Sequence, residues 1–368
     1  MTMGDARRDA ARYEVIDPQA TGAAAIDRAF ENQVAYCRDN GAAVTAAVCA
    51  GLRDLLRGEE GGPVMRRVRG WSGPPLADAL PLRLAGGLHA LHLSRREPEL
   101  APLYEGRYVK HLPGLLVSVL KGHEAFLLPW LDSPPQTNEA GRSWGYAAAM
   151  LWLADRGLPP RFELLEVGSS AGINLMMARY RYHLGGVAVG PEDAAMRIAP
   201  EWRGPPPPSR NVAIVSARGC DVAPIDLGDD AEALRLKAYI WPEHTERFAR
   251  MDVAVAEAKR SAPDVTRERG DAFLAAALAR PQAQGTTRVA MHSVVWQYIP
   301  PTERRRIDRL LEAAGERATA ETPLAHISLE ANRDTHRHEL RVRFWPGGAE
   351  WRHLGTAHPH GAWVEWDL

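Results

Sequence analysis

The chain has 368 residues, of which 45% are hydrophobic and 25% are charged, a composition typical of globular proteins. Its net charge of −1 does not supply the basic surface that nucleic-acid binding requires. No run of about 20 apolar residues could span a membrane. The charged N-terminus, MTMGDARRDAARYE, lacks the apolar stretch of a secretory signal. We therefore expect a cytoplasmic protein whose partner is a small molecule, with no nucleic-acid or membrane partner; the sequence leaves the oligomeric state open.

The first 158 residues have the pattern of a helical domain. Apolar residues recur at three- and four-residue spacing over 24–57, with a break near residue 40, which predicts two helices. Residues 58–75 are rich in glycine and proline, which predicts a loop. Further helices are predicted over 76–94, 114–128 and 139–156. Because 368 residues exceed what one hydrophobic core usually organises, we expect residues 1–158 to form a separate domain.

From residue 159 onward, short apolar runs alternate with helical stretches, which predicts parallel strands joined by crossover helices. Two C-terminal runs, 340–345 and 362–366, have no helix between them and are expected to close the sheet as an antiparallel pair. The expected fold class is α/β, with a mostly parallel sheet over residues 159–368. The other predicted strands are 162–167, 212–217, 265–269, 288–295 and 324–329.

The segment LLEVGSSAGINL, residues 164–175, has a strand that runs into a glycine-containing turn. A phosphate-binding P-loop would need Lys and then Ser or Thr after its last glycine, whereas Ile173 follows Gly172. A dinucleotide fingerprint would place a glycine two residues after Gly168, where this chain has Ser170. The segment does match the GxSxG elbow of serine hydrolases, with Ser170 as the nucleophile. Histidines that could complete a triad follow at His292, His358 and His360.

The carboxylate of Glu166 favours a different chemistry, because it suits a bound ammonium group and would oppose the oxyanion of a hydrolase. From residue 161 onward the sequence resembles class I S-adenosylmethionine-dependent methyltransferases. Their first motif, E/D-x-G-x-x-x-G, is matched by Glu166, Gly168 and Gly172. The resemblance implies a Rossmann-like sheet that binds S-adenosylmethionine as cofactor, held by this turn and by its other polar residues, Ser169, Ser170 and Asn174.

Two further stretches extend this resemblance. VTRERGDAF, residues 265–273, is similar to the third-strand motif, whose acid accepts a hydrogen bond from adenine; this acid is Asp271, which could equally cap the helix that begins there. The acid that holds the ribose is matched by Asp221 or by Asp226, and the sequence does not decide between them. TRVAMHSVVWQYIP, residues 287–300, is similar to the fourth strand and the segment that borders the methyl donor, which implies a place near the reaction for His292, Trp296 and Tyr298.

These residues suggest a simple mechanism. A sulfonium already carries an activated methyl group, so the protein mainly aligns an acceptor and excludes water. For a hydroxyl or amine acceptor, His292 is the expected general base, with Tyr298 as a second catalytic candidate. Each has a structural alternative: His292 as a hydrogen-bonded core histidine, and Trp296 and Tyr298 as core aromatic residues.

The stretch QTNEAGRSWG, residues 136–145, contains three polar residues that could reach over the carboxyl edge of the sheet: Asn138, Glu139 and Arg142. We expect them on the substrate side of the site, beneath a lid formed by the helical domain, although simple helix capping also explains them. Two pairs of histidines have spacing that suits metal ligands, but no Asp, Glu or Cys completes a site. We therefore expect no metal. The pairs are His336 with His338, and His358 with His360.

Over most of residues 80–368 the chain also resembles a bacterial family catalogued only as a domain of unknown function. The similar stretches are PPQTNEAGRS, LLEVGSSAGINL, RGCDVAPID, HSVVWQY, WPGG and HPHG. The sequence thus predicts an S-adenosylmethionine-dependent methyltransferase that acts on a small-molecule O or N nucleophile. Three alternatives stay open: a protein that binds S-adenosylmethionine without transferring its methyl group, such as a lyase, cyclase or sensor; a serine esterase that uses Ser170; and a structural protein with a vestigial turn.

Overall fold

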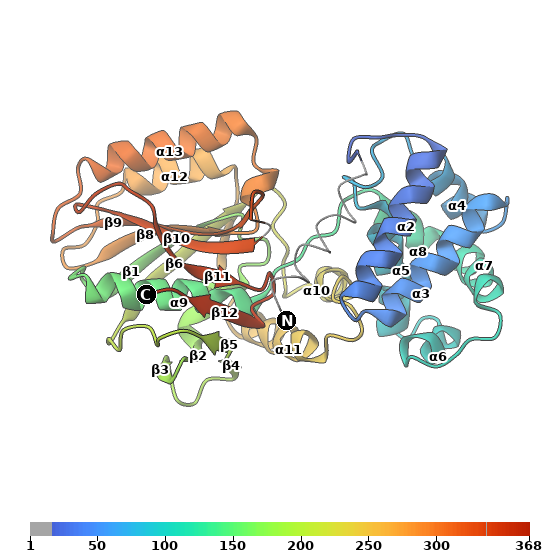
Figure 1. Ribbon diagram of the computed structural model, residues 1–368, viewed down its shortest axis with the longest axis horizontal. Helices are drawn as coiled ribbons and strands as arrows, with labels where there is room; N and C mark the ends of the chain where they lie inside the picture. Colours follow the sequence, from blue (N-terminus) through green and yellow to red (C-terminus); the bar gives the residue numbers. More distant parts are fainter. Residues whose placement is uncertain (1–16, 336) are drawn as a thin grey trace. The chain divides into compact units, whose positions relative to one another are not determined.

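The computed structural model describes residues 17–335 and 337–368, and these form two compact units (Figure 1). Unit 1 comprises the chain up to Thr137 together with Asp230–Phe248. Unit 2 comprises Asn138–Asp229 and Ala249–Leu368. The sequence predicts domains over 1–158 and 159–368. This assignment stays a prediction, because two compact units do not show which parts of the chain function separately.

Unit 1 is helical: α5 (Leu80–Leu93) is buried on nearly all sides, and helices such as α2 (Ala23–Asp39) bury one apolar stripe. In α2 the stripe is formed by Ile26, Phe30, Val34 and Cys37, and α2 packs against α3 (Ala43–Asp54), as the spacing predicts. The chain returns to this unit with α10 (Asp230–Ala238), which packs on α5. The remaining helices of the unit are α4 (Gly62–Arg69), α6 (Ala101–Tyr104), α7 (Leu112–Gly122), α8 (Glu124–Leu127) and the start of α11 (Thr245–Arg260).

The loop predicted over residues 58–75 is wrong in its middle, where helix α4 forms. Three apolar side chains of this helix, Val64, Met65 and Val68, are fully buried in the core of unit 1. Pro63 lies in the first turn, where proline costs no helical hydrogen bond. Burial of one face therefore outweighs the glycines and the proline that indicated a loop.

Unit 2 contains a nine-stranded sheet in the order β5-β12-β11-β10-β9-β8-β1-β6-β7, most of whose neighbouring pairs are parallel. It is a mixed α/β structure, as predicted. The C-terminal pairing differs from the prediction, because β11 (Arg352–Ala357) lies between β10 and β12, and β12 also pairs in parallel with β5. The other strands are β1 (Arg161–Val167), β5 (Glu201–Arg203), β6 (Ala213–Asp221), β7 (Asp264–Arg267), β8 (Thr287–Ser293), β9 (Leu324–Asn332), β10 (Arg337–Trp345) and β12 (Trp363–Trp366).

The connection from β1 to β6 departs from the expected crossover helix. After the glycine turn the chain forms a short 3-10 helix, η5 (Ile173–Arg179), and then a small three-stranded sheet in the order β3-β2-β4. These short strands are β2 (Tyr180–Leu184), β3 (Val187–Val189) and β4 (Met196–Ile198). The sequence analysis did not predict them, because β3 and β4 have three residues each and β2 has five, which is too short for a clear alternating pattern.

Helices cover the two faces of the large sheet (Figure 1). Leu165 and Val167 of β1 lie in the apolar core with α12 (Gly270–Leu278) and α13 (Pro301–Gly315). On the opposite face lies α9 (Ser143–Asp155), whose side chains are buried from Ser143 to Leu153. Since successive strand residues point to opposite faces, Glu166 faces the α9 side.

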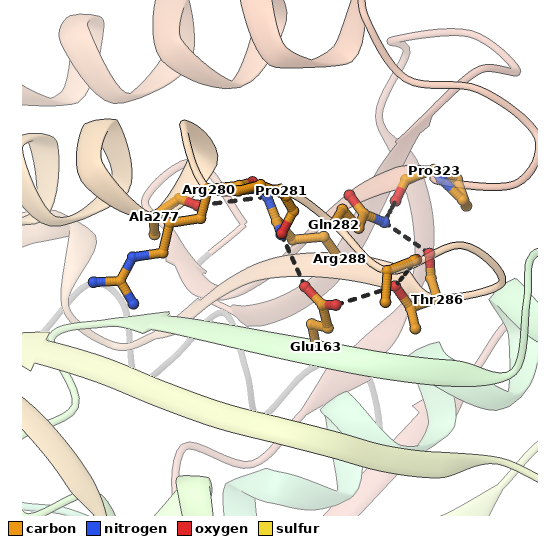
Figure 2. A network of polar contacts seen from close by, with 9 residues as sticks. Glu163, Ala277, Arg280, Pro281, Gln282, Thr286, Arg288 and Pro323 are labelled. Atoms are coloured by element: carbon orange, nitrogen blue, oxygen red, sulfur yellow. Dashed lines mark hydrogen bonds and ion pairs between the residues drawn. The ribbon is translucent and has the colours of Figure 1, made fainter.

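A polar network ties the amino edge of the sheet together (Figure 2). Arg288 of β8 donates to Glu163 of β1 through Nε (3.1 Å) and Nη2 (3.0 Å). Its guanidinium also donates to the main-chain carbonyls of Ala277, Arg280 and Pro281. Arg288 is buried and Glu163 nearly so, which makes this a desolvated, fully hydrogen-bonded ion pair.

We predict that Arg288→Ala lowers the free energy of unfolding by about 3 kcal/mol, because it leaves the Glu163 carboxylate without its cation. The measurement is denaturant unfolding of the full chain. The matched control is Arg210→Ala, which removes an exposed ion pair to Asp155 and should cost at most about 1 kcal/mol. Equal losses in the two variants would contradict the prediction.

Candidate functional site

The candidate site lies at the carboxyl ends of β1 and β8, which are parallel neighbours at the centre of the sheet. From β1 the strand order proceeds one way through β6 and β7, and from β8 the other way through β9. Ligands of open α/β sheets bind outside the carboxyl ends of the strands at such a reversal. The residues that end these two strands are Glu166 to Gly168 and Ser293 to Val295.

The glycine turn after β1 is held by main-chain hydrogen bonds to β6. The N–H groups of Gly168 and Ser169 both donate to the Cys220 carbonyl, each at 2.9 Å. The carboxylate of Asp221 accepts the N–H of Ser170 at 2.8 Å. Gly168 and Gly172 have φ angles of +73° and +69°, which glycine adopts without strain. The two glycines are therefore needed for the shape of the turn itself.

Glu166 is the most perturbed acid of this region. It is 1% exposed, and burial raises the pKa of its carboxyl to about 7. Its Oε1 accepts a hydrogen bond from Asn174 Nδ2 at 2.8 Å, whereas its Oε2 has no partner among the described residues. A buried carboxylate oxygen without a donor is rare and costly, since such groups are normally paired.

Two other buried polar atoms of the turn segment, Ser170 Oγ and Asn174 Oδ1, also lack a partner in the part of the chain that the structure describes. The buried Tyr146 hydroxyl on α9 interacts with Glu166 and with Ser293. Burial raises the pKa of Tyr146, and the carboxyls of Glu166 and Glu330 add to the effect. We call these four side chains, Glu166, Ser170, Asn174 and Tyr146, the Glu166 cluster; together they offer both donors and acceptors to a polar ligand.

His292 lies on the opposite face of the sheet from Glu166, because Glu166 is in register with Met291. Its Nδ1 is 2.7 Å from Glu330 Oε1, and its Nε2 is 3.1 Å from His326 Nε2. Arg343 Nε donates to His326 Nδ1 at 3.2 Å. We call this line of side chains across β8, β9 and β10 the His292 row; it comprises Glu330, His292, His326 and Arg343.

The donor at one end of the His292 row fixes the protons along it. Because Arg343 can only donate, His326 Nδ1 must accept, and neutral His326 carries its proton on Nε2. That proton points at His292 Nε2, so His292 keeps its own proton on Nδ1 and donates it to Glu330. Burial lowers the pKa of His326 well below its usual range, which keeps it neutral. Both nitrogens of His292 are therefore engaged.

Of the three polar residues before α9, Asn138 contacts the segment after the glycine turn, whereas Glu139 and Arg142 bond other segments. Asn138 Oδ1 accepts the N–H of Ile173, the first residue after the turn, at 3.0 Å. Glu139 Oε1 accepts from Gly141 N and from Arg250 Nε, both at 3.0 Å. Arg142 Nε donates to the Pro359 carbonyl at 2.8 Å. All three side chains are buried and anchor the segment that leads into α9.

Asp271 and the aromatic residues after β8 do not join the Glu166 cluster by any contact in the described structure. Burial opposes ionisation of Asp271, but hydrogen bonds from Arg306 and Arg269 outweigh it and lower its pKa. Asp271 lies in the first turn of α12, which begins at Gly270. Trp296 stacks on His292 with ring centroids 4.3 Å apart, and Tyr298 is 75% exposed.

The geometry of Ser170 bears on the esterase alternative. Its φ of +53° is unusual for a residue other than glycine, and strained nucleophiles occur in serine elbows. However, no described residue forms a hydrogen bond with its hydroxyl. The histidine that does lie against a carboxylate, His292, directs its second nitrogen to His326. A serine–histidine–acid arrangement is thus not formed among the described residues.

The histidine pairs give no metal centre in the described part of the chain, where no group of three or more His, Cys, Asp or Glu side chains could hold an ion. His358 and His360 have ring centroids 5.6 Å apart in the turn before β12. His338 lies on β10, and His336 lies outside the described residues.

Sequence analysis missed Tyr146, Glu330, His326 and Arg343. Tyr146 is hidden within an apolar helix, and the members of the His292 row lie on three different strands, β8, β9 and β10. One signal was present: Glu330 follows the apolar run of β9 at its carboxyl end, where ligands of parallel sheets bind.

Residues 27–366 match the family described as "Uncharacterized protein conserved in bacteria" (DUF2332), so the chain belongs to that family. No curated protein matches the sequence. Among the described residues, no helix is both long and apolar enough to cross a bilayer.

We predict that Gly168→Ala destabilises unit 2 by clearly more than the strain of a positive φ alone. A Cβ at this position would lie 2.3 Å from Val295 Cγ2. The control is Gly285→Ala, where φ is +70° and nothing lies within 4 Å, so that it measures strain alone, about 1 kcal/mol. Thermal unfolding of both variants checks the difference, and equal shifts would show that the turn has room.

We predict that stability falls as pH rises from about 4.5 to about 7 on account of Glu166, whose pKa is raised from 4.5 to about 7 by burial. In this window the unfolded chain has already lost the proton that the folded chain keeps, so raising the pH favours unfolding. Glu166→Gln removes this dependence and should exceed the wild type at pH 8 by up to about 3 kcal/mol, but not at pH 4. Urea unfolding across this range tests it, and parallel pH curves would exclude it.

Proposed function

We propose that this protein binds S-adenosylmethionine through the glycine turn and transfers its methyl group to an O or N nucleophile of a small molecule. The support comes first from topology. The strand order β7-β6-β1-β8-β9 matches the order 3-2-1-4-5 of a doubly wound sheet, which supports a Rossmann-like assignment. The motif Glu166, Gly168 and Gly172 then falls at the end of its first strand, beside the reversal.

The observation that carries the proposal is the unpartnered Oε2 of Glu166. A buried carboxylate needs a cation or a donor, and an amino-acid ammonium supplies both. The nearby Asn174 Oδ1 and Ser170 Oγ offer further hydrogen-bonding positions to the same ligand. The residues of the Glu166 cluster therefore fit the aminocarboxypropyl end of an adenosyl amino acid.

The acids assigned to the ribose and to the adenine do not fit this proposal equally well. Asp221 ends β6 and accepts the N–H of Ser170, and this contact with the turn supports it as the ribose acid. Asp226 is less buried and accepts Gly228 N. Asp271 is already bonded by two arginines, so an adenine contact would have to be shared with them. The short 3-10 helix after the turn also differs from the long helix of class I enzymes.

When bound, the cofactor would supply a methyl group activated on a sulfonium. The Glu166 cluster would then orient it, and the buried walls around Tyr146 would exclude water. Because both nitrogens of His292 are engaged, we assign His292 the role of orienting Glu330, and Glu330 becomes the better candidate to receive a proton from the acceptor.

A second candidate function is binding of S-adenosylmethionine without methyl transfer. This candidate is favoured because no histidine of the described site presents a free ring nitrogen to the Glu166 cluster.

Calorimetric titration of the full chain with S-adenosylmethionine and S-adenosylhomocysteine tests the proposal. Wild type should bind both, and Glu166→Gln should bind at least about tenfold more weakly, because a charge-assisted hydrogen bond to the ammonium is lost. Ser170→Ala should keep most of the affinity while abolishing any ester hydrolysis. Absence of heat with both compounds for the wild type would exclude the proposal.

Mass spectrometry of the reaction mixture separates the two candidate functions. Incubation of S-adenosylmethionine with a panel of small amines and phenols should yield S-adenosylhomocysteine if methyl transfer occurs. Binding without this product supports the second candidate.

A further inference from the structure

The segment after β8, Val294 to Tyr298, covers the glycine turn. Gly168 packs so closely against Val295 that a Cβ on the glycine would lie 2.3, 2.8 and 3.0 Å from three Val295 carbons. A ligand that approaches the main chain of Gly168 therefore meets the Val295 side chain. We call residues 294–298 the Val294 segment.

Backbone strain is present at the start of this segment. Val294 has a φ of +52°, a conformation that β-branched residues rarely adopt. Its own N–H donates to the Leu329 carbonyl at 3.1 Å, which ties the strained residue to β9. Strain of this kind persists only where surrounding contacts hold it, and it is found at switches and ligand clamps.

Glu330 supplies the holding contacts. Its Oε1 accepts the N–H of Val295 at 3.1 Å and the N–H of Trp296 at 3.2 Å. The same oxygen accepts His292 Nδ1–H at 2.7 Å, and Trp296 stacks on the His292 ring. One carboxylate oxygen thus fixes two consecutive amides of the Val294 segment.

The His292 row fixes which partner donates in the hydrogen bond between His292 and Glu330. Arg343 and His326 leave His292 no position for its proton other than Nδ1, so His292 always presents a donor to Glu330. Arg343 is in turn held by Asp308 of α13 at 2.7 Å and stacks over Trp351. Glu330 and the residues that support it therefore lie on β8, β9, β10 and α13.

We propose that the Val294 segment is a gate over the Gly168 turn, held closed by Glu330 and biased toward opening by the strain at Val294. The identity of the ligand that it admits rests on the proposed function. In the free protein the closed form competes with the ligand, so the measured affinity is the intrinsic affinity reduced by the fraction of open molecules. Weakening the anchor should then strengthen binding.

Hydrogen exchange of the free full-length protein tests the anchor without any ligand. In Glu330→Ala the amides of Val295 and Trp296 should exchange at least about tenfold faster than in the wild type, and in Glu330→Gln less so, because Gln keeps an acceptor oxygen. The control is Glu339→Gln. Glu339 is the cross-strand neighbour of Glu330 and the more buried of the two, and it bonds Asn332, Thr335 and Arg341 instead of the Val294 segment.

Stopped-flow binding and calorimetry with S-adenosylhomocysteine test the gate. Glu330→Ala should associate faster and bind about tenfold more tightly, because more molecules are open. Val294→Gly should act in the opposite direction, since glycine removes the strain from the closed form. A merely structural disturbance would shift both variants the same way.

The outcomes separate the two proposals. Unchanged exchange at Val295 and Trp296 in Glu330→Ala and Glu330→Gln would overturn the anchor. Faster exchange with unchanged or weaker binding of S-adenosylhomocysteine would overturn the gate. If the wild type does not bind this compound, the proposed function fails, and the exchange data on Glu330 and Val294 variants still decide whether Glu330 holds the segment.

Discussion

Desolvation of one carboxyl group is the constraint on which the carboxyl edge of the sheet depends. Glu166 lies near the end of the central strand β1 and is almost fully buried. Its Oε1 accepts a hydrogen bond from Asn174. Burial raises the pKa of the carboxyl and outweighs this bond, a hydrogen bond from Ser169 and the charge of Arg142, all of which favour the ionised form. A carboxyl in this position must stay protonated near neutral pH or find a positive partner. The turn that follows, with two left-handed glycines and an N–H held by Asp221, keeps Asn174 within reach of it. At this edge of the sheet, Oε1 of Glu166 is hydrogen-bonded and Oε2 has no partner among the described residues.

The polar side chains on the two faces of the sheet differ in how completely they are hydrogen-bonded. On the α9 side the Glu166 cluster contains buried atoms that have no partner among the described residues. On the α12 and α13 side the His292 row is a continuous chain of donors and acceptors, each matched to the next. Incomplete pairing suits recognition and complete pairing suits rigidity. The Val294 segment contacts residues on both sides: Glu330 of the His292 row accepts its main-chain N–H groups, and Val295 packs on Gly168 of the glycine turn.

The sequence was informative where local pattern decides structure. Buried parallel strands are continuous apolar runs, as in β1 and β8, and these strands, together with β6, β7 and β9, could be predicted to within a few residues. Glu166 was found because its motif spans only seven residues. Glu330 and Arg343 were not, because their contacts with His292 and His326 join side chains on different strands, whose register no local pattern records. The same limit concealed β11, which displaced the expected pairing of β10 with β12.

The path of the chain between the two units has its own consequence. It leaves unit 1 after Thr137, returns at Asp230, and leaves again within α11 after Phe248. Helix α10, on the returning piece, packs against α5. A fragment that ends before β1 would therefore lack the helix that packs on α5, and a fragment that starts there would carry α10 without its packing partner. Neither unit can be expressed complete by a single cut of the chain.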